Sequence, residues 1–124
     1  MSDSSANLRV ALLELVDDLE ELEVLLCVRE QGGRKGLGFE AIMRVVSFTR
    51  PAVRGALERL AARGLISCTA IEPAVYRFDP QSARMGETFT RIAAAYRDNP
   101  LEVMRLMSAI AVERVRTAAA KRFS

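Results

Sequence analysis

The side chains best suited to chemistry in this sequence are arginines that recur between residues 44 and 63, namely Arg44, Arg50, Arg54, Arg59 and Arg63. A guanidinium group binds a phosphate or a carboxylate through two parallel hydrogen bonds, and it also matches the O6 and N7 edge of guanine. Arg50 and Arg54 are four residues apart, so a helix would place them on one face, one turn apart. This spacing predicts a surface that binds an anion.

Most residue types that carry catalysis or hold metals are absent or badly spaced. The 124 residues include no histidine, which removes the Ser–His and Cys–His nucleophile pairs and most zinc sites. Cys27 and Cys68 lack the spacing of metal ligands, and we interpret both as reduced thiols in core or half-buried positions. The glycines at positions 32, 33, 36 and 38 follow no strand pattern, so they predict no phosphate-binding loop. We therefore expect no enzyme activity, no cofactor and no metal.

The charge is unevenly distributed, although its net value is only +2. Residues 1–31 carry eight acidic and two basic side chains, residues 32–78 carry three acidic and eight basic, and residues 79–124 carry five acidic and eight basic. A basic middle region behind an acidic first third is typical of a surface that meets an anion, with nucleic acid as the first candidate. The alternative is that the arginines only solvate helix surfaces.

Length and hydropathy indicate a single globular domain over residues 1–124. Half of the residues are hydrophobic, which is enough for a core in a chain of this length. No apolar run reaches the roughly 18 residues that cross a membrane, and the acidic, polar start is unlike a secretory signal. We expect a cytoplasmic protein without membrane contact.

The elements that position the arginines begin with a helical segment at residues 7–30. Ser4 or Ser5 could cap its start, and Asp17–Asp18 could cap a second helix, so one helix and two helices are both possible. This segment either forms a dimer or folds back on its own domain. A flexible turn at residues 31–36 is predicted to end it. Its leucines recur at alternating intervals of four and three residues, which predicts one apolar stripe. This stripe consists of Leu8, Leu12, Leu15, Leu19, Leu22 and Leu26.

Two short helices with a turn between them are predicted at the start of residues 39–78. The first follows helical spacing over residues 39–46. Thr49 is a good N-cap for the second, and Pro51 is tolerated in its first turn because the missing N–H would be unpaired there. The second helix runs to about Arg63. Its expected buried face is Ala52, Val53, Ala56, Leu57, Leu60 and Ala61.

A short hairpin is predicted after the second helix. Gly64 stops the helix, and residues 65–70 and 75–78 are rich in β-branched and aromatic side chains. The connecting residues 71–74 contain no lysine or arginine. They include Glu72, which would repel a phosphate.

Residues 39–78 resemble the winged-helix transcriptional regulators, the broad group that includes the MarR-like and PadR-like proteins. In that group a small residue in the first helix is followed four residues later by a turn glycine, and six residues after that by a buried aliphatic residue. Met43, Ser47 and Val53 occupy these positions, and residues 61–66 resemble the passage from the recognition helix into the first wing strand. Met43 is larger than the usual alanine and Ser47 replaces the usual glycine, so the turn must adapt slightly. The resemblance implies a mainly α fold with a small β-hairpin, a winged helix-turn-helix with flanking N- and C-terminal helices.

The resemblance also implies that residues 49–63 form a recognition helix that enters the major groove of double-stranded DNA in a transcriptional regulator. Arg50 and Arg54 lie near the end of that helix that contacts base edges, so they are the first candidates for base or phosphate contact. Nearby threonine hydroxyls are candidate phosphate donors, and further arginines are candidate backbone clamps. These further candidates are Thr49, Arg44, Arg59, Arg63 and Thr69.

The tip of the hairpin favours a different function. Regulators of this group that grip DNA with the wing usually present basic residues there, whereas this tip carries Glu72. Together with the acidic N-terminal segment, this favours the alternative of a winged-helix adaptor that binds a protein and does not contact DNA.

The C-terminal helices are predicted over residues 82–122, with Pro100 at the start of the last one. Their apolar surface exceeds what one small domain can cover, so we predict a homodimer that could address two DNA half-sites. Met85, Met104 and Met107 could line a pocket for an apolar effector, with core packing as the alternative. The apolar residues on one side of the last helix, part of the surface that a partner helix would cover, are Leu101, Met104, Met107, Ile110, Ala111, Val115 and Ala118.

Overall fold

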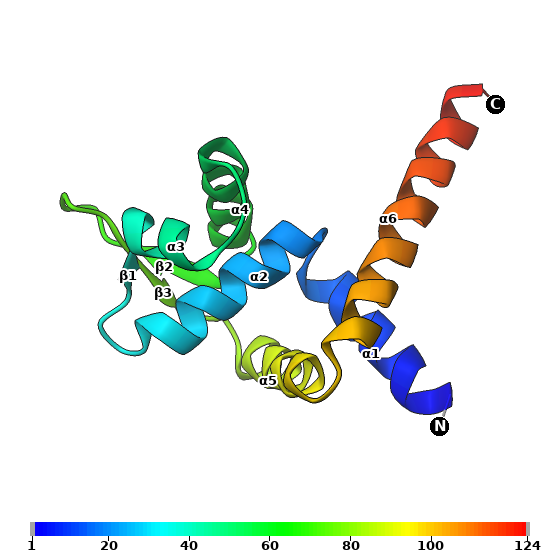
Figure 1. Ribbon diagram of the computed structural model, residues 1–124, viewed down its shortest axis with the longest axis horizontal. Helices are drawn as coiled ribbons and strands as arrows, with labels where there is room; N and C mark the ends of the chain where they lie inside the picture. The colour runs from blue at the N-terminus through cyan, green and yellow to red at the C-terminus, as the bar shows by residue number, and fades with distance from the viewer. Residues whose placement is uncertain (1, 124) are drawn as a thin grey trace.

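The computed structural model of the protein describes residues 2–123 and is mainly helical, with a small three-stranded antiparallel sheet (Figure 1). Its elements in chain order are α1 (Ser2–Leu15), α2 (Leu19–Cys27), η1 (Val28–Gly32), β1 (Leu37–Gly38), α3 (Phe39–Val45), α4 (Arg50–Ala62), β2 (Ile66–Cys68), β3 (Val75–Phe78), α5 (Ala83–Asp98) and α6 (Pro100–Phe123). α1 and α6 lie at one end of the molecule and the sheet lies with α3 and α4 at the other, with α2 and α5 between them.

The N-terminal segment consists of two helices with a break between them. Asp18 caps α2 by accepting a hydrogen bond from the backbone N–H of Glu21 at 2.8 Å, so the two-helix alternative is correct. The predicted cap at Ser4 or Ser5 is wrong, because α1 already begins at Ser2 and both serines lie inside it. α1 folds back against α5 and α6 of its own chain, and every leucine of the predicted stripe is buried or half-buried.

A five-residue π-helix, η1, extends α2 as far as Gly32. The turn therefore begins after Gly32 and not at Gln31 as predicted. Gly36 has a φ of 82°, which glycine adopts without steric cost. A Cβ atom at Gly36 would also come within 2.8 Å of the Tyr76 carbonyl oxygen in β3. Glycine therefore lets this turn pass close to the sheet.

The two helices predicted in the central region are confirmed as α3 and α4. Residues 46–49 join them, and Thr49 caps α4 by accepting a hydrogen bond from the N–H of Ala52 at 3.3 Å. Gly64 ends α4 with a φ of 79°. Ala61 was predicted to be buried but is exposed, because only one side of α4 packs against α2. The buried side chains of α4 are Val53, Ala56, Leu57 and Leu60.

The sheet has the strand order β1-β3-β2, and both pairings are antiparallel. β2 and β3 form the predicted hairpin, although β2 covers only Ile66–Cys68 and not residues 65–70. β1 was not predicted. Its two residues are too few to show an alternating pattern, and it forms because Leu37 and Gly38 pair with Tyr76 and Val75 of β3.

The chain itself covers only part of the predicted apolar side of the last helix, namely Met107 and Ile110. α6 does begin at Pro100, but Leu101, Ala111, Val115 and Ala118 are exposed. α6 packs against α5 and α1 in its first half, Glu113 and Arg114 still pair with Arg9 and Asp17, and its C-terminal end extends away from the rest of the molecule (Figure 1). The buried residues of α6 are Val103, Met107 and Ile110.

Buried side chains of the helices and of β2 meet in one hydrophobic core. Met107 is buried in this core and Met85 packs against it, which is the core-packing alternative for these two methionines, whereas Met104 is half-buried on α6. Within residues 2–123, no helix is both long and apolar enough to span a membrane.

Candidate nucleic-acid interface

The N-terminal end of α4 presents Arg50 and Arg54 to solvent. Thr49 precedes them as the cap, so Arg50 is the first residue of the helix and Arg54 follows one turn later. Both guanidinium groups lie over the Phe39 ring at the start of α3, at 5.0 Å (Arg50) and 4.5 Å (Arg54) from the ring centroid. These distances permit cation–π attraction. Phe39 therefore holds the two positive charges side by side at one helix end.

Glu40, the residue after Phe39, forms an ion pair with Arg50. The two guanidinium nitrogens of Arg50 donate to the two carboxylate oxygens of Glu40 at 2.6 and 3.1 Å. The hydrogen bond from Arg50 lowers the pKa of Glu40, and the hydrogen bond to Glu40 raises the pKa of Arg50. Both side chains are exposed, so the pair can open at little cost.

The loop between β2 and β3 closes one side of the arginine pair. A cleft of about 440 Å³ is lined by Arg50, Arg54 and Phe39 on the helices and by Glu72 and Pro73 on the loop. The helix wall therefore carries the two arginines and the Glu40 carboxylate, and the loop wall carries a second carboxylate, that of Glu72.

Two further predicted DNA contacts, Arg44 and Thr69, lie outside α4. Arg44 is exposed in the last turn of α3. Thr69 follows β2, and its hydroxyl accepts a hydrogen bond from the Val75 N–H at 3.0 Å. The Thr69 side chain therefore helps to close the hairpin loop.

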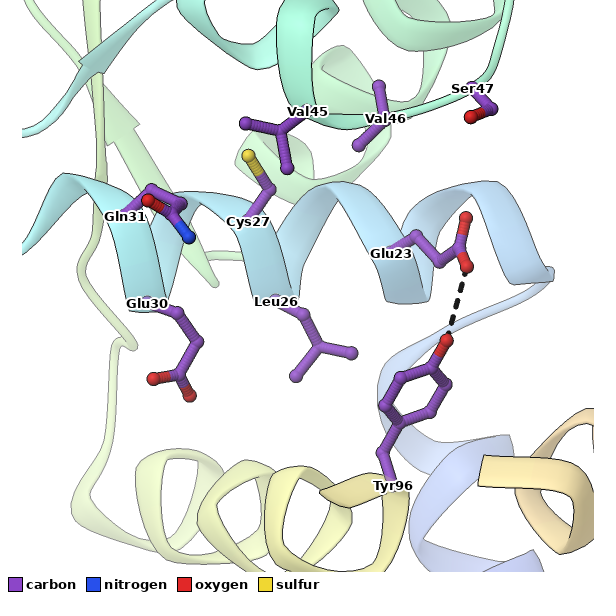
Figure 2. Close-up of a pocket in the computed structure, with 9 residues that line it drawn as sticks. All are labelled: Glu23, Leu26, Cys27, Glu30, Gln31, Val45, Val46, Ser47 and Tyr96. Carbon is purple, nitrogen blue, oxygen red and sulfur yellow. Dashed lines mark hydrogen bonds between the residues drawn. The ribbon is translucent and has the colours of Figure 1, made fainter. Parts of the chain in front are cut away.

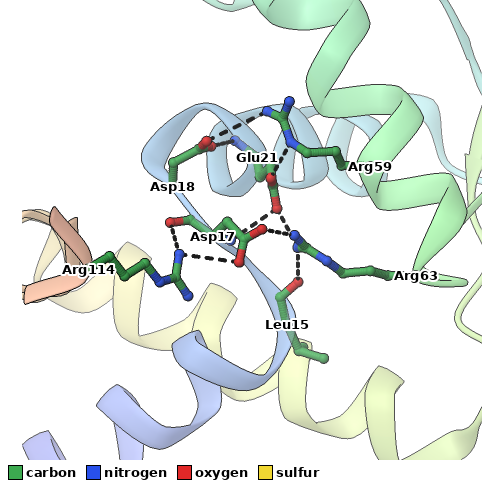
Figure 3. A network of polar contacts seen from close by, with 7 residues as sticks. All are labelled: Leu15, Asp17, Asp18, Glu21, Arg59, Arg63 and Arg114. Carbon is green, nitrogen blue, oxygen red and sulfur yellow. Dashed lines mark hydrogen bonds and ion pairs between the residues drawn. The ribbon is translucent and has the colours of Figure 1, made fainter. Parts of the chain in front are cut away.

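The remaining two predicted contacts, Arg59 and Arg63, belong to an ion-pair network at the other end of α4 (Figure 3). Both pair with the carboxylate of Glu21, which is fully buried, and the Arg59 Nε–Oε2 distance is 2.6 Å. This hydrogen bond raises the pKa of Arg59. Arg63 also donates to the Leu15 carbonyl at 2.9 Å and pairs with Asp17.

The network joins four helices around the break between α1 and α2. Asp17 contacts Arg114 of α6, at 3.2 Å between Nη1 and Oδ1, while its own N–H donates to Glu21 at 3.0 Å. Arg59 and Arg63 thus hold α4 against the start of α2. The sequence predicts Glu21 as one of the acidic side chains that keep the N-terminal helical segment soluble or hold this end away from DNA, and its burial shows that the predicted exposed position is wrong. Its position three residues after Asp18 matches a capping box, which signals a helix start but gives no sign of burial.

A second cleft, of about 300 Å³, lies across α2 between the end of α3 and α5 (Figure 2). Apolar Leu26 and Val45 line it together with the acidic side chains of Glu23 and Glu30. Tyr96 donates a hydrogen bond to Glu23 at 3.2 Å, and burial, followed by the Glu23 charge, raises the pKa of Tyr96. No basic side chain lines this cleft, so it does not extend the arginine surface.

Both cysteines are free, but their surroundings differ. Cys27 is buried, which raises the pKa of its thiol, whereas Cys68 is exposed. The interpretation of Cys68 as a core or half-buried residue is therefore wrong, because Cys68 is the last residue of β2, next to the hairpin loop, and is exposed there. Among the described residues, no group of three or more His, Cys, Asp or Glu side chains is placed to hold a metal ion.

Comparison of the chain with protein-family models, curated proteins and solved structures finds no match.

Proposed function

We propose that this protein is a winged-helix DNA-binding protein that acts as a dimeric transcriptional regulator. In this proposal α3 and α4 form the helix-turn-helix, β2 and β3 form the wing, and α4 enters the major groove of double-stranded DNA. The order of these elements, a helix pair followed by a hairpin, is the one that the resemblance of residues 39–78 implies.

The observation that carries the proposal is the exposed pair Arg50 and Arg54 at the start of α4. Two guanidinium groups held on one ring, at the helix end that contacts bases in this motif, suit guanine edges and backbone phosphates. Arg44 is a candidate backbone clamp from the neighbouring helix. Arg59 and Arg63 are weaker candidates, because their guanidinium groups are already paired with Glu21.

A titration of binding to a fluorescein-labelled DNA duplex of random sequence, between about 50 and 200 mM salt, tests the proposal. We expect affinity to fall steeply with salt. Replacing both Arg50 and Arg54 by alanine should reduce the slope of log K against log salt by about 0.9 for each arginine that contacts a phosphate, at most about 1.8, and lower the affinity at least about tenfold.

The matched control removes two exposed arginines from α5 instead, as Arg91→Ala with Arg97→Ala. This variant loses the same charge but none of the proposed contacts, so its affinity should change much less. An equal loss in both variants would show that only net charge matters. Undetectable or salt-independent binding by the wild-type protein would count against DNA binding.

A protein-interaction adaptor is the second candidate, and the hairpin tip favours it. Ile71 is 80% exposed, although an isoleucine is normally buried, and Glu72 follows it. An apolar residue beside a carboxylate suits a protein partner better than a phosphate backbone. In that case the arginine pair would bind acidic side chains of the partner, and binding to random DNA would be absent.

A further inference from the structure

We propose that the Glu40 carboxylate takes the place of a DNA phosphate in the free protein. It pairs with Arg50 there and must be displaced when α4 binds DNA. This inference rests on the proposed function and assigns a regulatory role to a residue next to the arginine pair. It follows from the position of Arg50, the geometry of its ion pair and the ring below it.

Arg50 stands where a cation is least favourable on a helix. It is the first residue of α4, and the N-terminal end of a helix carries a partial positive charge that favours anions. The first turn of α4 contains no acidic residue that could offset this charge. An anion must therefore come from outside α4, and Glu40 on α3 supplies it.

The pair has the geometry of an arginine–phosphate contact. Two nitrogens of Arg50 meet two oxygens of Glu40 at 2.6 and 3.1 Å, the bidentate arrangement that arginine also makes with phosphate. Glu40 lies in the first turn of α3, where a negative charge is favoured.

Arg50 can exchange partners without leaving its place. Its guanidinium group rests on Phe39 beside that of Arg54, and the side chains of Arg50 and Glu40 are 55% and 63% exposed. Arg54 makes no ion pair within 4 Å among the described residues. The two arginines therefore differ: Arg54 is open to an anion, whereas Arg50 is occupied until a phosphate or a base displaces Glu40.

The exchange has two measurable consequences. When Arg50 binds DNA, it loses its ion pair with the Glu40 carboxylate. The released Glu40 then lies close to the DNA backbone and repels it. Glu40→Gln, which keeps the side-chain size but removes the charge, should strengthen binding to random-sequence duplex about two- to fivefold. It should also make the slope of log K against log salt steeper by up to about 0.9, as one additional effective phosphate contact would.

A double-mutant cycle separates a specific exchange from a general charge effect. In the Arg50→Ala background the Glu40→Gln gain should fall below about twofold, because no occupied arginine remains to be released. Glu58→Gln is the matched control, because Glu58 is an exposed acid on α4. It removes the same charge without opening an ion pair, so its gain should be smaller. Circular dichroism checks that each variant is folded, and Glu40→Ala should give the same gain as Glu40→Gln.

The ion pair itself is tested by NMR titration of the Glu40 carboxyl group. Its pKa should rise toward the ordinary glutamate range when Arg50 is replaced by alanine, and no rise would overturn the inference. An unchanged affinity of Glu40→Gln, or a gain that persists in full without Arg50, would also overturn it while leaving the proposed function intact. If no variant binds DNA in a salt-dependent way, the proposed function fails and the inference fails with it.

Discussion

Glu21 shows how one buried charge can organise several helices. Its carboxylate is fully removed from solvent, yet it accepts hydrogen bonds from Arg59, Arg63 and the Asp17 N–H. A buried carboxylate is tolerated only when such partners replace the water that it has lost. These contacts link the start of α2 to the end of α4.

Replacing Glu21 by glutamine should therefore destabilise the protein. The substitution keeps the size of the side chain but leaves two guanidinium groups without their buried counter-charge. We expect the free energy of unfolding to fall by about 3 kcal/mol, the lower part of the range for breaking a buried pair, because both arginines can still reach water. Urea denaturation followed by circular dichroism measures the change.

The control for Glu21 is Glu87→Gln, the same substitution at an exposed position on α5. It should change the free energy of unfolding by no more than about 0.5 kcal/mol. Equal effects of the two substitutions would mean that the network contributes nothing beyond surface charge.

At the scale of elements, the end of α4 depends on a single glycine. Gly64 has a φ of 79°, and the N–H of Leu65 bonds back to the Leu60 carbonyl at 3.0 Å, so the chain turns sharply from α4 into β2. A Cβ atom at Gly64 would lie 2.2 Å from the Gln81 side chain. An alanine would therefore be strained in its backbone and would also displace Gln81.

We expect Gly64→Ala to lower the free energy of unfolding by about 1–2 kcal/mol. Gly55→Ala is the matched control, because Gly55 lies inside α4 without a positive φ and its Cβ would meet only the guanidinium group of Arg59, at 3.1 Å. That substitution should change the free energy of unfolding by less than about 1 kcal/mol, because the higher helix propensity of alanine offsets the small shift required of the Arg59 guanidinium, which Glu21 holds. Thermal or urea unfolding measures the change in the free energy of unfolding of both variants. A Gly64→Ala variant that is more stable than the wild type would show that alanine is not strained at this position.

At the scale of the whole molecule, the second half of α6 carries apolar side chains that its own chain does not cover. Val112 and Val115 are 50% and 68% exposed on a segment that extends away from the core (Figure 1). Exposed apolar side chains that lie together favour a protein partner, and for a dimeric regulator a second copy of α6 is the simplest one.

Replacing Val112 and Val115 by aspartate should therefore convert a dimer into a monomer. Size-exclusion chromatography with light scattering should give twice the 13.7 kDa chain mass for the wild type and the single chain mass for the variant. Ile71→Asp, which removes a still more exposed apolar residue from the hairpin tip, should stay dimeric. A monomeric wild type would exclude the dimer.

The sequence alone determined the elements whose ends are set by local chemistry. Thr49 and Gly64 mark the limits of α4 because a cap hydroxyl and a positive φ act on the nearest backbone groups. The Asp17–Asp18 cap between α1 and α2 was visible for the same reason, although a single helix was equally consistent with the pattern. The predicted arginine surface also followed from residue types and helical spacing.

Only the tertiary structure decided which arginines are available to bind an anion. Glu21 lies 38 and 42 residues before Arg59 and Arg63, and Glu40 lies ten residues before Arg50, so no helical period or short motif links these charges. β1 and the buried face of α6 depend in the same way on partners that are distant in the chain. Periodicity shows which side of a helix is apolar, but packing between distant segments decides which side is covered and which charges are neutralised.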